Sequence, residues 1–369
     1  MAANILPRQA PAHPLHPPYP AKTAGLGGLP SVGVDVPICT VFLLLFLLGA
    51  ISHMTILQIN QKRGHKFLMS GMLFGFCMAR IMSCVLRIAW ATHQTNIRLA
   101  IAAQVFVAAG VVLLFIVNLI FAQRIIRAAH PNSGWHPLFA ASFKAIYVLI
   151  VITLIMIITS VVQTFYTLNA NTRRIDRDIL LYGQTLFTVI SFLPIPLVII
   201  GLVIPRTTRV EKFGSGRFRS KIAILVTATA ILCLGAAFRA GTNYLTPRPA
   251  TNPAWYHSKA CFYIFNFTVE VIVILLYVIV RVDRRFWVPN GARAAGDYAA
   301  GGKAVEIEKG VERGIMPEEE VFDDAPEADV VSAEDGRKGD VEEGKISGSE
   351  EEVGNTVNHK EADGKEEKI

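Results

Sequence analysis

Four charged residues lie inside long apolar stretches of this chain: Arg80, Arg87, Arg239 and Glu270. A charge in hydrocarbon is costly, so such residues usually face a charged partner or a water-filled cavity. Counted along their stretches, Arg80 and Glu270 fall at similar depth, near the middle. We therefore expect an Arg80–Glu270 ion pair. It serves either to lock two helices together or as a ligand site with a gating or proton-coupled role.

Arg87 and Arg239 lie nearer one end of their stretches. In the simpler interpretation, their long side chains extend to the lipid headgroups at that end. In the alternative, they line a positive outer vestibule for an anionic lipid or a small anionic ligand, because three arginines in these stretches face one acid. The sequence leaves both interpretations open.

Other polar side chains recur at helical spacing on five of the stretches. Contacts between helices explain them most simply, since polar and small side chains hold membrane helices together. A polar interior is the alternative. The residues expected to line it are Gln104, Asn118, Gln184 and Asn266. Pro194 and Pro196 interrupt the fifth stretch and predict a helix kink, because each removes a backbone donor.

Known catalytic patterns are absent from the sequence. Glu270 has no second carboxylate beside it, no nucleophile is paired with a base, and no Cys/His spacing suggests zinc. We expect no enzyme activity, no cofactor and no metal.

Seven apolar stretches must position these residues, and each is about long enough to cross a bilayer, which takes ~20 residues. They predict an all-α, polytopic membrane protein with seven transmembrane helices. The expected spans are residues 36–59, 67–91, 99–122, 145–168, 179–204, 222–240 and 260–280.

Composition and charge divide the 369-residue chain into three parts. We expect a disordered N-terminal segment (1–35), a transmembrane domain (36–289) and a disordered acidic tail (290–369). The tail holds 10 Lys/Arg against 23 Asp/Glu, whereas residues 1–289 hold 26 against 6. The basic residues lie in short loops beside the apolar stretches, so we expect the lipid bilayer and no nucleic acid as partner.

Lysine and arginine counts in the loops predict the orientation. The segments 60–66, 123–144, 205–221 and 281–293 hold sixteen, and the opposite set holds eight. The richer set is expected to be cytoplasmic, which puts the N-terminus outside and the C-terminus in the cytoplasm. We expect the plasma membrane rather than an internal membrane.

Three serines of the tail, Ser332, Ser347 and Ser349, each have an acid three positions later. This pattern is typical of acidophilic kinase sites and predicts phosphorylation. The sequence does not identify a cytosolic partner of the tail.

Two resemblances add to this interpretation. The motifs at residues 65–71 (HKFLMSG) and 130–137 (HPNSGWHP), with the end of the last stretch, resemble a family of uncharacterised fungal seven-span membrane proteins over about residues 36–290. Phe238-Arg239, residues 255–257 (WYH) and Tyr263 are more distantly similar to the fungal lipid-translocating exporter (RTA-like) family, which implies lipid translocation. That family carries glutamates where this chain has Ala240, Gly241 and Ser258.

The buried charges, the kinked fifth stretch and the exporter similarity favour a transporter or lipid-handling protein with a polar interior. The alternative is a seven-span receptor or sensor. It would be an unusual one, since the third stretch ends in Gln123-Arg124-Ile125 without an acid-Arg-aromatic triplet, and the last lacks an Asn-Pro-x-x-Tyr motif. An intramembrane enzyme ranks last.

Overall fold

The computed structural model describes residues 16–21, 23–205 and 210–298 of the chain. The chain divides into two units, residues 1–324 and 325–369, and all described residues belong to the first. The three tail serines, Ser332, Ser347 and Ser349, and the expected acidic tail from residue 299 onward lie outside the described residues.

Helices make up most of the described chain, and seven helical segments are long and apolar enough to span a membrane. In the described residues the only β-type pairing is an isolated bridge between Thr23 and Pro249. The prediction of a multi-pass, all-α membrane protein is thereby confirmed. The seven segments are α1 (Val32–Lys62), α2 (Leu68–Thr92), α3 with α4 (Ile97–Gly110, Val112–Ala129), α6 (Pro137–Tyr166), α7 with α8 (Ala170–Phe192, Pro194–Val203), α9 (Phe218–Tyr244), and α10, η2 and α11 in succession (Lys259–Tyr263, Ile264–Thr268, Val269–Ile279).

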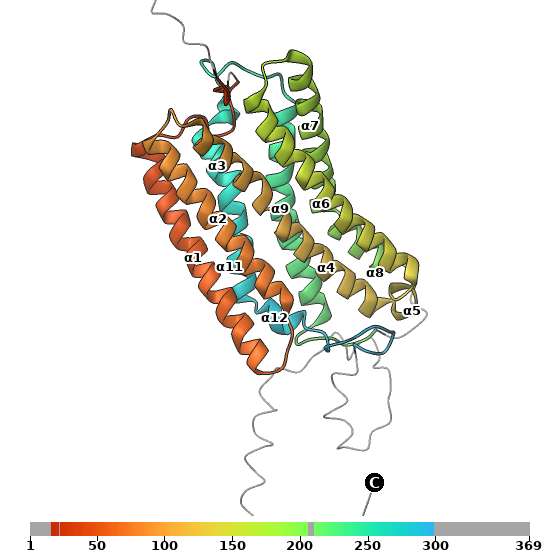
Figure 1. Cartoon of the computed structure of the whole chain (residues 1–369). Helices are drawn as coiled ribbons and strands as arrows, with labels where there is room; N and C mark the ends of the chain where they lie inside the picture. Colours follow the sequence, from red (N-terminus) through yellow and green to blue (C-terminus); the bar gives the residue numbers. More distant parts are fainter. Residues whose placement is uncertain (1–15, 22, 206–209, 299–369) are drawn as a thin grey trace, which may run out of the picture. The chain divides into compact units, whose positions relative to one another are not determined.

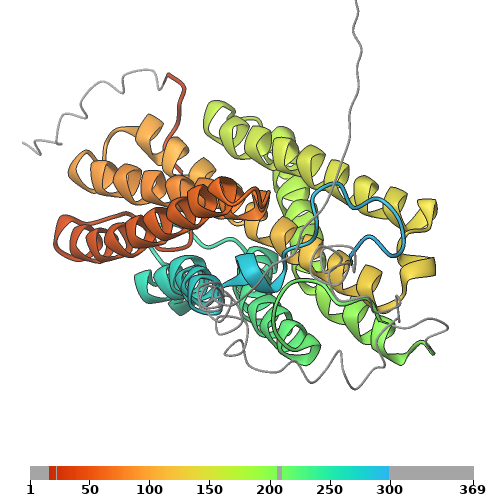
Figure 2. The same cartoon turned by 90° about the horizontal axis from the view of Figure 1, so that it is seen from below.

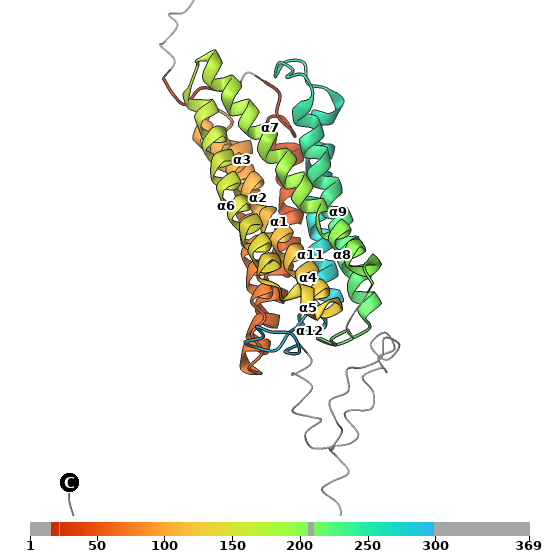
Figure 3. The same cartoon turned by 90° about the vertical axis from the view of Figure 1, so that its right-hand side faces the viewer.

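Three short helices lie between or after these segments: α5 (Pro131–Gly134), η1 (Trp255–His257) and α12 (Val282–Arg285). The long helices run side by side (Figures 1 and 3). Contacts are most extensive between α1 and α2, between α2 and α3, and between α7 and its neighbours α6 and α9. We call the end where α1 begins the Asp35 end, and the end that carries α12 the Asp283 end. Figure 2 shows the latter from below, where the blue chain after α12 crosses it.

Large apolar side chains remain exposed along the outer faces of the helices. On α1 they include Val41, Leu44 and Leu48, and on α6 they include Val151 and Ile155. Such extended exposed apolar surface is unfavourable in water and is expected where lipid replaces it. The interior is packed by aromatic and aliphatic side chains from all seven segments.

The third and fifth spans are each divided into two helices. α7 ends at Phe192 and α8 begins at Pro194, so the helix is interrupted where the proline pair predicts a kink. Pro194 has no N–H to donate to the preceding turn. The division of the third span at Val111 was not predicted, because no proline marks it.

The start of the first span also differs from the expectation. α1 begins at Val32 rather than residue 36, and Asp35 lies in its first turn. Residues 23–31, expected to be disordered, are held by hydrogen bonds to the segment between α9 and α10: the Ala24 N–H donates to the Arg248 carbonyl (2.8 Å) and the Gly27 N–H to the His257 carbonyl (3.0 Å). The hydropathy pattern does not show this boundary, because the first turn of α1 is held by polar contacts.

A close approach of backbones fixes α9 against η2. A Cβ at Gly235 would lie 2.7 Å from the Phe265 carbonyl oxygen and 3.0 Å from Val269 Cγ2. One turn away, the rings of Phe238 and Phe265 stack with centroids 3.8 Å apart. Small residues at such crossings let membrane helices approach closely.

We expect Gly235→Ala to lower the stability by about 1–3 kcal/mol, the usual cost of forcing extra volume into a packed site. This exceeds the gain of up to ~1 kcal/mol that alanine brings to a helix interior. Gly241→Ala on the same helix is the matched control, since nothing lies within 4 Å of its Cβ position. Melting temperatures of both variants in detergent check this. Equal melting temperatures for the two would contradict a tight crossing at Gly235.

Candidate functional site

Arg80 and Glu270 form a bidentate ion pair between α2 and α11. Arg80 Nε donates to Glu270 Oε2 (2.5 Å) and Arg80 Nη2 to Glu270 Oε1 (2.6 Å). Both side chains are fully buried. The parallel fork of the guanidinium matches the two carboxylate oxygens, the strongest geometry for such a pair. The structure thus brings together the two residues that their depth in the sequence paired.

The third guanidinium nitrogen of Arg80, Nη1, contacts α3 in the divided third span. This nitrogen donates to the carbonyls of Val107 (3.0 Å) and Phe106 (3.4 Å). Carbonyls in the last turn of a helix lack partners within the helix, and Val107 belongs to the last turn of α3. Gly110 leaves room for the guanidinium, because a Cβ there would lie 3.1 Å from Arg80 Cζ. The division at Val111 therefore supplies acceptors to the buried arginine.

Arg239 is the third charged residue of this cluster. Its Nη1 lies 3.8 Å from Glu270 Oε1 and donates to Asn266 Oδ1 at 3.3 Å. The Asn266 amide in turn donates to the Phe262 carbonyl (2.9 Å). The Arg239 side chain is only 12% exposed, so it lies among the helices rather than extending to headgroups. Two guanidinium groups thus face one carboxylate.

A π-helical turn, η2, positions the polar residues of the last span. It runs from Ile264 to Thr268 and ends two residues before Glu270. The Thr268 hydroxyl donates to the carbonyl of Tyr263, five residues back (3.3 Å). The wider turn shifts Asn266 and Glu270 relative to a regular helix, and π-bulges of this kind frequently occur at functional sites.

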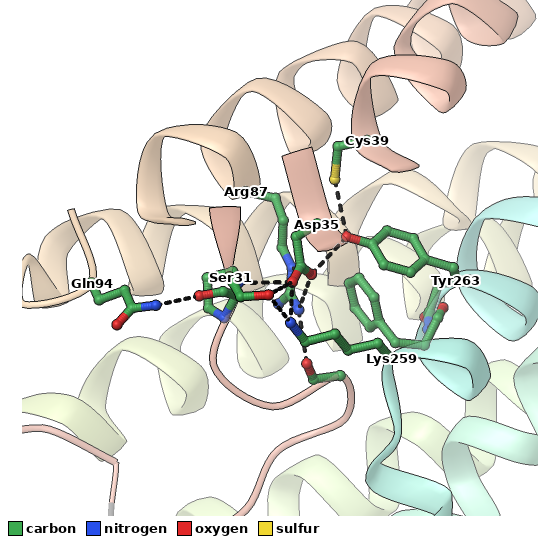
Figure 4. A network of polar contacts seen from close by, with 11 residues as sticks. Ser31, Asp35, Cys39, Arg87, Gln94, Lys259 and Tyr263 are labelled. Carbon is green, nitrogen blue, oxygen red and sulfur yellow. Dashed lines mark hydrogen bonds and ion pairs between the residues drawn. The ribbon is translucent and has the colours of Figure 1, made fainter. Parts of the chain in front are cut away.

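A second buried cluster lies at the Asp35 end (Figure 4). Arg87 donates to Asp35 Oδ1 from Nη2 (2.9 Å) and Nε (3.1 Å), and the Tyr263 hydroxyl donates to the same oxygen (2.7 Å). Lys259 Nζ and the Ser31 backbone N–H donate to Oδ2, at 2.5 Å and 2.8 Å. Asp35 is fully buried, and its charged partners are Arg87 and Lys259.

Arg87 takes part in this cluster and does not extend outward. It is 4% exposed, donates from Nη2 to the Gly27 carbonyl (2.8 Å), and its guanidinium lies 4.4 Å from the ring centre of Phe262. The pairing of Arg87 with Asp35 was not predicted from the sequence, because Asp35 was assigned to the N-terminal segment. A signal was present: Asp35 lies four residues before Cys39, on the face of α1 that is buried. The count of three arginines against one acid is corrected accordingly.

The expected polar lining does not converge on one place. Asn118 is buried, accepts a hydrogen bond from the Tyr277 hydroxyl and donates to Thr229 Oγ1 (3.2 Å). Asn266 belongs to the Glu270 cluster. Gln104 is exposed on the outside of α3, and Gln184 is half-buried on α7. Among these four residues, Asn118 and Asn266 lie in the interior. The prediction for Gln104 and Gln184 was wrong because helical spacing does not tell which face of a helix packs inward.

Within the described residues, no group of three or more His, Cys, Asp or Glu side chains is placed to hold a metal ion. What the two clusters offer is positive charge in a buried setting, suited to binding an anion.

Comparison with known proteins gives a family without an assigned activity. The chain matches the family model described as "Protein of unknown function (DUF3112)". The match covers residues 131–219 and 216–287, and so includes Arg239 and Glu270 but not Asp35, Arg80 or Arg87. Neither the curated proteins nor the solved structures contain a match. The family model is compatible with the resemblance to an uncharacterised family.

Proposed function

We propose that this protein is a transporter or lipid-handling protein whose cargo carries negative charge. The observation that carries the proposal is the weakly held guanidinium of Arg239 beside the Arg80–Glu270 pair. Both oxygens of Glu270 accept short hydrogen bonds from Arg80, and Arg239 lies 3.8 Å from the nearer one.

Arg239 has donors to spare for a ligand. A guanidinium carries five N–H donors, and the described residues supply one hydrogen-bond acceptor to Arg239, the Asn266 side chain. A buried charge without full compensation is unfavourable. An anion that reached this position would supply the missing acceptors and balance the second positive charge, while Arg80 keeps Glu270 in place.

The second cluster supports the same conclusion. Arg87 and Lys259 together face the single carboxylate of Asp35, so an excess positive charge lies at the Asp35 end as well. We place this end at the outer face, with the C-terminus in the cytoplasm, because loops rich in lysine and arginine stay on the cytoplasmic side. The plasma membrane is the proposed location, and no catalytic step is part of the proposal.

A flux measurement tests this function. Purified protein is placed in phosphatidylcholine vesicles that contain acyl-labelled fluorescent phosphatidylserine, and dithionite bleaching follows its movement between leaflets. Parallel vesicles measure uptake of radiolabelled inorganic phosphate, and labelled phosphatidylcholine serves as the zwitterionic comparison. We expect movement of an anionic probe that exceeds both phosphatidylcholine movement and protein-free vesicles.

Arg239→Gln is expected to slow that movement about tenfold or more, since a hydrogen bond to a charged group contributes roughly 1.5–3 kcal/mol. Arg98→Gln is the matched control: it removes the same charge from an exposed position at the start of α3. No movement of either anionic probe, or equal rates for both variants, would refute the proposal.

A receptor is the second candidate, favoured by the contacts of the last span. Tyr263 binds Asp35 at one end of the bundle, and Asp283, just after the span, accepts a hydrogen bond from Asn60 at the other (3.1 Å). One continuous element thus connects polar contacts at both ends. A receptor would bind its ligand without moving it, so binding that persists in the absence of flux would favour this candidate.

A further inference from the structure

A cavity of about 350 Å³ lies at the Asp35 end, between the end of α6, the start of α7, the end of α9 and the chain before α1. Its volume is within the range of pockets for small molecules, ~300–1,000 Å³. Hydrogen bonds close one side of it: Tyr19 N–H donates to the Phe165 carbonyl (2.7 Å) and Ala24 N–H to the Arg248 carbonyl (2.8 Å). Neither charge cluster described above contributes a side chain to its lining.

The charged part of the lining is basic. Arg173 and Arg177 lie one turn apart on the same face of α7, and none of the residues that line the cavity is acidic. α7 begins at Ala170, so Arg173 lies in its first turn, where the helix dipole favours anions. Arg173 uses its Nε for the Thr167 carbonyl (2.9 Å) and Arg177 its Nη2 for the Leu245 carbonyl (3.4 Å), which leaves further donors on each guanidinium.

His257 adds an uncharged donor to the same wall. Its Nδ1 accepts a hydrogen bond from the Ala254 N–H (3.2 Å), so the proton of the neutral ring is on Nε2. Burial, and then the nearby charge of Arg248, lower the pKa of His257 below the ordinary histidine value. The lowered pKa favours the neutral ring, whose Nε2–H is a hydrogen-bond donor.

The lining becomes apolar toward the middle of the bundle. Leu180 and Leu181 follow Arg177 by one turn of α7 and line the cavity with Phe165. We propose that this cavity binds a phosphate-bearing amphiphile, with the phosphate at Arg173 and Arg177 and its apolar chain along the leucines. The order of the two parts matches a lipid in a bilayer, with the headgroup at the end of the helices and the chain directed inward.

The cavity lies one turn of α9 from Arg239, which does not itself line it. Thr242 and Asn243 line it from α9, three and four residues after Arg239, so the three share one face of that helix (Figure 3 shows α9 beside α7). Arg239 is one turn deeper in the bundle. The inference thus deepens the proposed function by naming the class of cargo and its entry site, and it rests on that function only for what happens after binding.

Binding in detergent tests the site without any flux. Wild-type protein in maltoside micelles is titrated with dioctanoyl phosphatidic acid, and separately with inorganic phosphate, while thermophoresis or native mass spectrometry follows occupancy. We expect saturable binding of phosphatidic acid, with free phosphate at least about tenfold weaker. Arg173→Gln/Arg177→Gln is expected to weaken phosphatidic acid binding at least about tenfold, as two charge-assisted hydrogen bonds are lost.

Arg174→Gln is the matched control, an exposed arginine in the same turn of α7 that does not line the cavity. Arg177→Gln alone is the second variant if the double variant does not fold, and the same direction is expected. Equal affinity of control and cavity variants overturns the site. Free phosphate that binds as tightly as phosphatidic acid overturns the amphiphile. Binding that depends on the two arginines in a protein without flux upholds the site and refutes only the transport proposal.

Discussion

Glu270→Gln is expected to destabilise the protein more than Arg80→Gln, although the two residues form one ion pair. Removing one partner of a buried pair typically costs about 3–5 kcal/mol, because the other charge is left unpaired. Without Glu270, Arg80 and Arg239 lose the only carboxylate that contacts them among the described residues. Without Arg80, Glu270 still has Arg239, whose Nη1 starts 3.8 Å away and needs a small movement to bond.

The double variant Arg80→Gln/Glu270→Gln separates a structural role from a ligand role. Two amides can hydrogen-bond to one another, so we expect the double variant to be more stable than Glu270→Gln alone. Melting temperature and the monodisperse yield in detergent measure all three variants. Recovery in the double variant identifies coupling between the two residues. If all three variants melt like the wild type, the pair does not lock α2 to α11.

Asp35→Asn is expected to be the second severe substitution, with a loss of about 3–5 kcal/mol for an uncompensated buried charge. Asparagine keeps one acceptor oxygen and turns the other into a donor, which must then face either Arg87 or Lys259. The carboxylate accepts from both cations and from Tyr263 at 2.5–3.1 Å, so no rotation of the amide satisfies all of them.

Hydrogen exchange adds a local measurement to the melting temperature of Asp35→Asn. Arg87 bonds both Asp35 and the Gly27 carbonyl, so the amides around Gly27 should exchange faster when the cluster loosens. Asp178→Asn is the control, because this aspartate is exposed on α7. Wild-type stability and exchange in Asp35→Asn would show that the cluster does not hold the chain before α1 in place.

Depth along the spans was enough to pair Arg80 with Glu270, because no other residue of opposite charge lies at a similar depth in the expected spans. Arg87 could not be paired with its acid in this way. Its partner Asp35 lies at the end of an apolar stretch, where polar residues are common and usually mark the start of a loop. The partner of Arg239 was also left open, since the depth of a residue does not give the direction in which its side chain points.

The sequence by itself determined that this is a seven-span helical protein, and each expected span overlaps one apolar helical segment, although the ends differ by up to nine residues. The reason is physical: a chain in hydrocarbon must satisfy its backbone within each helix, so length and hydropathy suffice. The tertiary structure decided where the other buried charges meet, because depth in a span does not give the direction of a side chain: Arg87 pairs with Asp35, 52 residues away, and Arg239 approaches Glu270. It alone divided the third span at Val111, inserted the π turn before Glu270 and left Arg239 weakly held, because these depend on how the helices pack against one another.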